Sequence, residues 1–191
     1  MSSALQDPPT PLVARAPWRE RILTPGAGPG GWAATLLVAL VAGALRFLRL
    51  EEPSGRIFDE IYYACDAQNL LRYGVEAGTE SGNQDCIPNG EAGFIVHPPL
   101  GKWAIGLGMR IFGVNEFGWR IAAAVAGTLM VLVLIRVTRR MTGSTVLACM
   151  AGLLLALDGL HFVQSRVAML DIFLAMWVLL AFACLVTDRD A

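Results

Sequence analysis

Two adjacent acids, Asp59 and Glu60, lie between an apolar run and an amphipathic stretch, in the sequence GRIFDEIYYACDAQNLLRYG at 55–74. A positioned carboxylate can accept the proton of a hydroxyl nucleophile, so this pair is a candidate for general-base chemistry. Acids also favour the first turn of a helix because of the helix dipole. For an isolated Asp–Glu pair the helix-start explanation is the commoner one. The residues around the pair must therefore decide between a structural and a catalytic role.

Two basic side chains occur in HPPLGK, where His97 and Lys102 flank the proline pair of a helix start. A helix N-terminus with a nearby cation is a good anion site. The residues alone leave other roles open. Lys102 can extend to a membrane interface as a snorkelling side chain, and His97 can cap the helix by hydrogen bonding.

Four more polar residues interrupt the apolar C-terminal half, namely Asp158, His161, Arg166 and Asp171. Asp158 and His161 are three residues apart and would be neighbours on one helix, either as a pair that satisfies itself or as part of a site. Arg166 is a candidate anion ligand. Asp171 could orient Arg166 by charge pairing or favour the start of a helix.

The cysteines have no metal-binding or redox spacing. Cys65 and Cys86 fall in a polar segment and could form a disulfide in an oxidising compartment, which the sequence leaves open. Cys149 and Cys184 fall in apolar runs and are expected to pack as inert residues. There is no tight cluster of metal ligands, so we expect no metal cofactor, and the net charge of −1 gives no reason to expect nucleic acid.

Composition points to an integral membrane protein. Of the 191 residues, 55% are hydrophobic and only 16% are charged, too few to cover the core of an ordinary soluble domain. A bilayer-spanning helix needs about 20 apolar residues. Such runs predict an all-α fold with four spans, at about 31–50, 117–137, 145–163 and 167–186. Residues 1–30 are Pro/Gly-rich and read as a disordered cytoplasmic leader, and 31–191 as one transmembrane domain.

The distribution of arginines predicts how these spans are oriented in the membrane. Basic residues concentrate on the cytoplasmic side of membrane proteins, and here they precede the first span, join the second to the third, and follow the fourth: Arg15, Arg19, Arg21, Arg136, Arg139, Arg140 and Arg189. The loop 51–116 therefore faces the outside. Three arginines do not fit this side and are expected to snorkel to the membrane interface: Arg46, Arg49 and Arg120.

The outer loop itself has three parts. Helical periodicity runs over 59–73 and ends at Gly74. Residues 75–93 are turn-rich and read as an exposed loop. The stretch 100–112 has one apolar face and is expected to lie on the bilayer as an interfacial helix. This arrangement would bring the acids and cations together on the outer face.

Three sequence words, FDE after the first span, HPPLGK before the second and SRVAMLD after the third, resemble the protein O-mannosyltransferase family in order and in topology. The resemblance covers about 31–186 and is nearest to the actinobacterial members. It implies the GT-C fold, a multi-spanning helical bundle with interfacial helices in the first outer loop. It also implies a glycosyltransferase of the plasma membrane that transfers mannose from polyprenyl-phosphate mannose to Ser or Thr hydroxyls of exported proteins.

The resemblance also assigns roles. Asp59 would be the general base of an inverting displacement, and Glu60 would position acceptor or donor. The leaving phosphate would be stabilised by Arg166, Lys102 and His97, with Asp171 in support. No metal is implied, and the partners would be the lipid donor, the secretory polypeptide, membrane lipids and the secretion translocon.

Members of this family are considerably longer, so we expect this chain to be an N-terminal portion that is inactive alone. Two alternatives remain. One is a GT-C transferase with a lipid or glycan acceptor. The other is a non-catalytic four-span scaffold or transporter subunit, which would not explain why acids and cations gather on one outer face.

Overall fold

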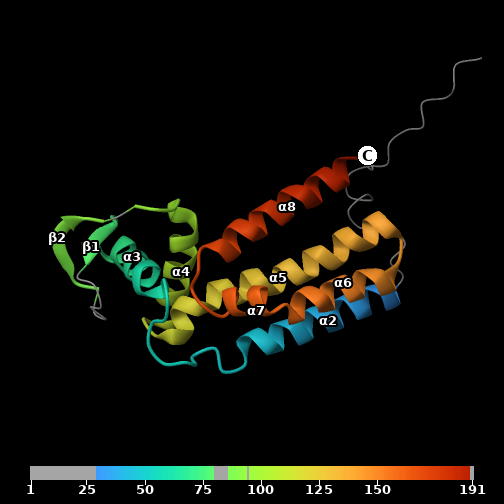
Figure 1. The fold of residues 1–191 in the computed structure, drawn as a ribbon, viewed down its shortest axis with the longest axis horizontal. Coiled ribbons are helices and arrows are strands. Elements are labelled where there is room, and N and C mark those ends of the chain that lie inside the picture. Colours follow the sequence, from blue (N-terminus) through green and yellow to red (C-terminus); the bar gives the residue numbers. More distant parts are fainter. Residues whose placement is uncertain (1–28, 80–85, 94, 190–191) are drawn as a thin grey trace, which may run out of the picture.

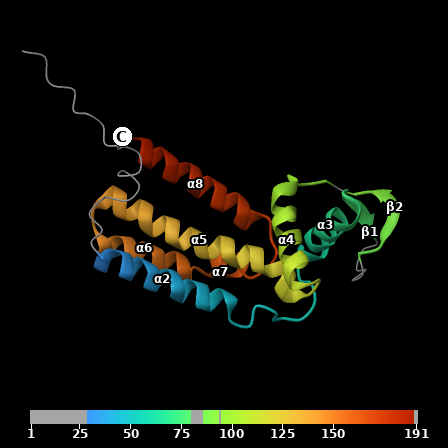
Figure 2. The ribbon, with the colours of Figure 1, turned by 180° about the vertical axis from the view of Figure 1, so that it is seen from behind.

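The computed structural model describes residues 29–79, 86–93 and 95–189, which are mostly helical. Four helices run along one another and form a bundle (Figure 1), with a short helix beside them. A cap of two helices and a small sheet lies at one end of this bundle, as Figure 2 shows from behind. The bundle helices are α2 (Pro29–Phe47), α5 (Glu116–Thr142), α6 (Thr145–Leu157) and α8 (Asp171–Arg189), with the short α7 (Gly159–Gln164). The cap consists of α3 (Glu60–Tyr73), β1 (Ala77–Thr79), β2 (Pro88–Ala92) and α4 (Pro99–Phe112).

Helix α5 is the central element, since it contacts α2, α4, α6 and α8. Its ends are set by local chemistry. The Asn115 side chain caps the first turn by accepting the N–H of Gly118 at 2.8 Å. Gly143 ends the helix in the left-handed conformation, with φ of 69°. Helix α5 therefore connects the cap with the bundle, since its residues contact α4 as well as α2, α6 and α8.

Helices α5 and α8 are long and apolar enough to cross a membrane, whereas α6 and the apolar part of α2 are shorter. The prediction of an all-helical membrane bundle is thus supported in its coarser form. The number of four spans stays a prediction. The expected leader, 1–30, lies outside the described residues except for its last two, which begin α2.

The predicted third span, 145–163, is divided in the structure. Helix α6 ends at Leu157 and α7 begins at Gly159, because Asp158 has extended backbone angles and caps α7. Its Oδ1 accepts the backbone N–H of His161 at 2.7 Å. The expected side-chain pair is therefore replaced by a cap. His161 Nδ1 instead lies 2.8 Å from a guanidinium nitrogen of the fully buried Arg46, so Arg46 packs inside rather than snorkelling.

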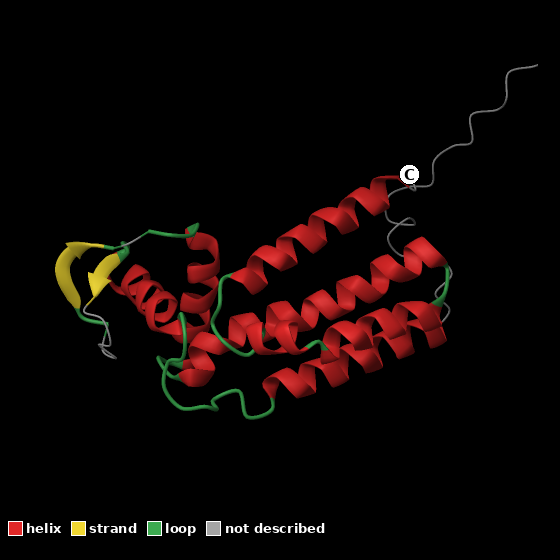
Figure 3. Cartoon of the chain, in the orientation of Figure 1, coloured by secondary structure: helices red, strands yellow, loops and turns green. Residues whose placement is uncertain are grey.

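The outer segment agrees with two predictions and corrects a third. Gly74 ends α3 with φ of 76°, and α4 begins at Pro99, as the local residues indicate. Residues 75–93 were predicted to be an exposed loop, but they contain the antiparallel pair of β1 and β2, drawn as arrows in Figure 3. A disulfide between Cys65 and Cys86 ties this segment to α3. The fold is therefore helical with one small sheet.

Candidate active site

Glu60, the second acid of the pair, is fully buried and surrounded by donors. Its Oε1 accepts from Arg120 Nε at 2.8 Å and from the backbone N–H of Ala168 at 2.8 Å. Its Oε2 accepts from Arg120 Nη2 at 2.9 Å and from the backbone N–H of Ile57 at 3.0 Å. A carboxylate offers about four acceptor positions. Glu60 therefore holds segments together, and its oxygens are already occupied.

Arg120 is the buried partner of Glu60, and the sequence did not predict this, since Arg120 was expected to snorkel. It is fully buried, and besides Glu60 it donates to the carbonyls of Leu50, Pro53 and Gly55 at 3.2, 2.8 and 2.8 Å. These bonds fix the connection from α2 to α3 against α5. Removing the Arg120 guanidinium from water is costly, and its hydrogen bonds and its ion pair with Glu60 offset that cost.

Asp59 lies just before α3 and is only half-buried. Its side chain makes no capping hydrogen bond, so the ordinary helix-capping role is not used here. Tyr63 follows one turn later. Burial first, and then the negative charges of Asp59, Asp171 and Asp66, raise the pKa of the Tyr63 hydroxyl. The two predicted site residues Asp59 and Asp171 thus both lie near Tyr63, a residue that sequence reasoning did not single out.

His97 joins this group through its ring. The rings of Tyr63 and His97 meet edge to face, with centroids 5.6 Å apart. His97 and the exposed Asp171 also line one cavity of about 180 Å³, next to Leu170 and Phe173. The structure therefore brings His97 against Tyr63 of α3 and into one cavity with Asp171 at the start of α8, while Asp59 acts on Tyr63 through its charge.

Lys102 occupies a separate cluster. Its Nζ lies 2.9 Å from Asp66 Oδ2 and 2.6 Å from Glu76 Oε2, and its side chain is fully buried rather than snorkelling. Burial disfavours the charge, but the bonds to Glu76 and Asp66 outweigh it, so the pKa of Lys102 lies above its ordinary value. For Asp66, burial has the larger effect and raises the pKa, although the nearby Lys102 acts to lower it. The cluster joins α4 to α3 and to the segment before β1.

Arg166 is bound to the end of α2. Its Nη1 donates to the carbonyls of Leu45 and Leu48, both at 2.9 Å, and its Nη2 donates to that of Arg49 at 2.8 Å. Helix C-terminal carbonyls lack partners within the helix and attract cations. Within the described part of the chain Arg166 makes no ion pair with Asp171, which was the other expectation. A guanidinium has five N–H donors, so two remain beyond these three bonds.

These positions suit a group transfer to a hydroxyl. Asp59 offers a carboxylate that is not used in capping, next to a residue that four donors lock in place. His97 and Asp171 border one cavity. Among residues 29–79, 86–93 and 95–189 no three His, Cys, Asp or Glu side chains form a group suited to a metal ion. The side chains that the structure places here are thus a carboxylate, an imidazole and a tyrosine, whereas Lys102 and Arg166 are bound to other partners.

Comparison with known proteins extends this description. The family model described as dolichyl-phosphate-mannose-protein mannosyltransferase matches residues 96–189. A polyprenol-phosphate-mannose–protein mannosyltransferase of Mycolicibacterium smegmatis is 40% identical over 187 residues, which cover 94% of this chain and 34% of the relative. One of Corynebacterium glutamicum is 36% identical over 162 residues, covering 83% of this chain and 30% of the relative. The chain thus spans about a third of the length of these relatives.

A shorter match reaches another transferase. An undecaprenyl phosphate-alpha-4-amino-4-deoxy-L-arabinose arabinosyl transferase of Pseudomonas paraeruginosa is 43% identical over 96 residues, which cover 49% of this chain and 17% of the relative. No solved structure matches the chain.

Proposed function

This chain belongs to the protein O-mannosyltransferase family, and on that premise we propose that the protein transfers mannose from polyprenyl-phosphate mannose to Ser or Thr hydroxyls of exported proteins. The relatives' names supply the donor and the protein acceptor. The observation that carries the proposal is the position of Asp59. Its carboxylate is not used to cap α3, and its charge acts on Tyr63, whose ring contacts His97.

We assign the acid–base step to Asp59. Its carboxylate accepts the proton of the acceptor hydroxyl while that oxygen attacks C1 of mannose from the face opposite the phosphate. The bond between C1 and the phosphate oxygen breaks, and polyprenyl phosphate leaves with its negative charge. Attack from the opposite face inverts the configuration at C1. The locked Glu60 is the next residue and holds the backbone of Asp59 in place.

Cations stabilise the leaving phosphate in this proposal. His97 borders the cavity, and Arg166 has two donors beyond its bonds to α2. Lys102 would contribute only by exchanging a carboxylate partner for the phosphate, because it is fully buried between Asp66 and Glu76. Asp171 at the start of α8 supports the site in this proposal, because it lines the same cavity as His97. The proposal requires no metal cofactor.

The site is proposed to face the outside of the plasma membrane. The Cys65–Cys86 disulfide supports this, since disulfides persist mainly in oxidising compartments. Contact with the secretion translocon remains a prediction from the resemblance.

One alternative has an observation in its favour. The match to an arabinosyl transferase that acts from undecaprenyl phosphate covers half of this chain. A lipid or glycan acceptor would use the same donor chemistry and the same base. The acceptor therefore distinguishes the two functions, and the experiment must offer both.

The test uses membranes that contain the complete protein, labelled polyprenyl-phosphate mannose, and either a Thr-rich peptide or lipid acceptors. Label should enter the peptide. Asp59→Asn should lower kcat by about 100- to 10,000-fold, the usual range for general-base catalysis. Asp188→Asn, an exposed acid at the far end of α8, is the matched control and should leave kcat unchanged.

Two results would overturn the assignment. Full activity of Asp59→Asn would remove Asp59 as the base. Absence of peptide labelling by the wild type, in a membrane preparation where a related mannosyltransferase is active, would remove the function, and labelling of lipid alone would favour the alternative.

A further inference from the structure

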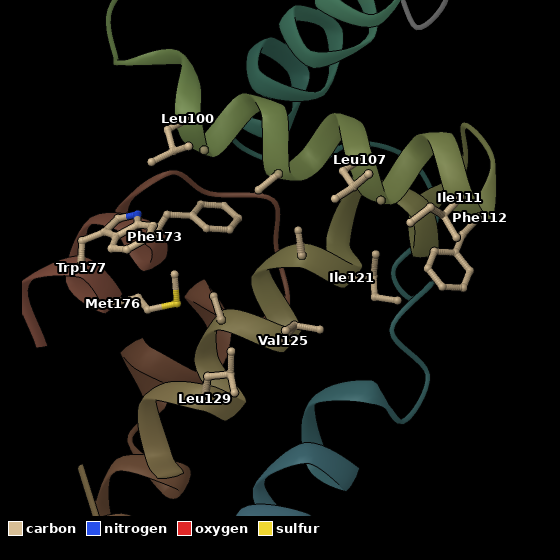
Figure 4. Close-up of a pocket in the computed structure, with 15 residues that line it drawn as sticks. Leu100, Leu107, Ile111, Phe112, Ile121, Val125, Leu129, Phe173, Met176 and Trp177 are labelled. Carbon is tan, nitrogen blue, oxygen red and sulfur yellow. The ribbon is translucent and has the colours of Figure 1, made fainter. Parts of the chain in front are cut away.

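A cavity of about 320 Å³ lies between α2, α5 and α8. Figures 1 and 2 both show the start of α2 and the ends of α5 and α8 together, at the end of the bundle that is opposite the cap. The larger cavity in Figure 4, between α4, α5 and α8, is lined by apolar residues alone. The cavity opposite the cap differs, because basic side chains line it together with Trp32 and apolar residues: Arg136, Arg139 and Arg140. We call it the arginine cavity.

The arginines of this cavity belong to α5 and reach both neighbouring helices. The Arg136 guanidinium lies over the ring of Trp32 on α2, 4.0 Å from its centroid. Arg140 Nη2 donates to the carbonyl of Thr187 on α8 at 3.4 Å. Arg139, which is buried, lines the cavity with them. The cations therefore lie where α2, α5 and α8 meet.

Arg136 has a hydrogen-bonding capacity that the described residues do not use. Its Nη1 is buried and, in the part of the chain that the structure describes, has no hydrogen-bond partner. None of the ion pairs among those residues includes Arg136. It lies six residues before the end of α5, which is about 9 Å along the helix axis. A guanidinium at that depth is costly to remove from water unless an acceptor or an anion pairs with it, and an anion in the cavity would do so.

The lining of the arginine cavity indicates the kind of anion. A guanidinium matches the geometry of a phosphate and can bind it through two N–H bonds at once. Beside the arginines the wall is apolar and comes from α5 and α8, with Leu132, Val133, Leu180 and Ala183. A free phosphate would use only the arginines, whereas a phospholipid would also bury its acyl chains against this wall. Basic pockets between membrane-spanning helices bind anionic lipid headgroups in this way.

We propose that the arginine cavity binds the phosphate of an anionic phospholipid, whose acyl chains lie against α5 and α8. With the cap outside the membrane, as proposed above, this lipid belongs to the cytoplasmic leaflet. Its phosphate contacts arginines that reach α2 and α8, so binding holds the three helices together at this end. The inference goes beyond the mannosyltransferase function and does not depend on it, because the cavity and Asp59 lie at opposite ends of the bundle.

The first test adds dioleoylphosphatidylglycerol to the complete protein in a neutral detergent and follows the Tm. A ligand that binds only the folded state raises the Tm as its concentration increases, and this dependence gives a Kd. Dioleoylphosphatidylcholine has the same acyl chains without net charge, and glycerol 3-phosphate has the phosphate without acyl chains. At the same concentrations neither should raise the Tm.

The same titration tests the contribution of the arginine. Arg136→Gln should raise the Kd for phosphatidylglycerol by about tenfold or more, the loss expected for one hydrogen bond to a charged group. Arg110→Gln, at an exposed arginine of α4 in the cap, is the matched control and should keep the wild-type Kd. Comparing the Kd values separates lipid binding from any effect of the substitution on the Tm itself.

The second test fills the cavity without removing a charge. Ala183 lines the cavity from α8, so Ala183→Phe places a ring where the acyl chains are proposed to lie. The Kd for phosphatidylglycerol should rise by about tenfold, because the ring displaces buried methylene groups of the lipid. Ala181→Phe, at an exposed position of the same helix that does not line the cavity, is the control and should keep the wild-type Kd.

Several outcomes would overturn the lipid site. An equal rise in Tm with phosphatidylcholine would show that the negative charge is not recognised, and an equal rise with glycerol 3-phosphate would make the ligand a free anion. A wild-type Kd in Arg136→Gln, or the same increase in Arg110→Gln, would remove the arginine cavity as the place of binding. If one of Arg136→Gln and Ala183→Phe fails to fold, the other decides. A response to phosphatidylglycerol without mannose transfer would keep the lipid site and remove the mannosyltransferase function.

Discussion

The ring of His97 is held edge to face against the ring of Tyr63, with the centroids 5.6 Å apart. This contact joins the segment before α4 to the first turns of α3. It brings an imidazole against the tyrosine whose hydroxyl pKa is raised, first by burial and then by the charges of Asp59, Asp171 and Asp66. The contact therefore connects HPPLGK with the helix that follows FDE.

Removing the Tyr63 ring should impair catalysis by releasing His97. Aromatic pairs contribute about 0.5 to 1.5 kcal/mol beyond burial, which corresponds to roughly two- to tenfold. We expect Tyr63→Ala to raise the donor KM by up to about tenfold, whereas Tyr63→Phe keeps the ring and stays within about twofold. Steady-state assays of both variants measure this. An equal loss in Tyr63→Phe would show that the hydroxyl matters and the ring contact does not.

Glu60 and Arg120 should matter for stability before they matter for chemistry. Removing one partner of a buried ion pair costs about 3 to 5 kcal/mol. Arg120→Leu and Glu60→Ala should therefore both lower the Tm of the purified protein in detergent by several degrees. Glu52→Gln, at a side chain that is 52% exposed, is the control and should leave the Tm unchanged. A Glu60→Ala protein with wild-type Tm and no activity would instead make Glu60 a direct participant.

Arg166 is bound to the end of α2 and has two N–H donors left for a phosphate. Variants can separate its stabilising role from its proposed role in phosphate binding. Arg166→Lys keeps the charge but cannot reach three carbonyls at once. Its Tm should fall, and its donor KM should rise less than that of Arg166→Met. Arg110→Lys, exposed on α4, is the control. An unchanged donor KM in Arg166→Met would refute phosphate binding, and an unchanged Tm in both variants would refute the stabilising role at α2.

The stability difference between the wild type and a Lys102 variant should depend on pH. Its folded pKa lies above the ordinary 10.5, so its contribution is fully present below pH 10.5 and is lost as the pH rises through the folded value. Lys102→Met should lower the Tm at pH 7, and the gap to the wild type should narrow above pH 10.5. Arg110→Met on the same helix is the control. A gap that stays constant from pH 7 to beyond pH 10.5 would contradict the prediction.

The disulfide should stabilise the cap. Cys65 and Cys86 are 21 positions apart, and closing a loop of that size contributes about 2 to 4 kcal/mol. Reduction, or Cys65→Ser with Cys86→Ser, should lower the Tm. A Cys149→Ser, Cys184→Ser double variant removes the free thiols and is the control.

The same cysteines test the orientation of the protein in the membrane. A membrane-impermeant maleimide added outside intact cells should label Cys65 and Cys86 only after reduction, and labelling that requires lysis would reverse the proposed orientation.

Local signals in the sequence predicted much of the cap. Gly74 and Pro99 act through their own backbone preferences, so the end of α3 and the start of α4 could be placed without any tertiary information. The strands β1 and β2 were missed because they are short and have no apolar alternation. The break at Asp158 was missed because the residues around it are apolar, so the run looks continuous.

The sequence offered some residues of the candidate site, whereas Tyr63 and the contacts within the site could not be predicted from it. Asp59 and His97 could be selected from residue type and from their place beside helix starts. The partner of Glu60 could not, because Arg120 is 60 residues away and its burial depends on how α3 packs against α5. The bonds of Arg166 to the end of α2 depend in the same way on contacts between distant segments.

The hydrogen bond from the N–H of Ala168 to Glu60 has a mechanical consequence. Asp59 precedes Glu60 by one residue, and Asp171 follows Ala168 by three. The segment that leads into α8 is thus tied, through the Glu60 side chain, to the residue next to Asp59. A tilt of α8 that carries Asp171 would therefore pull, through that side chain, on the start of α3, so Asp59 and Asp171 do not stand on independent elements.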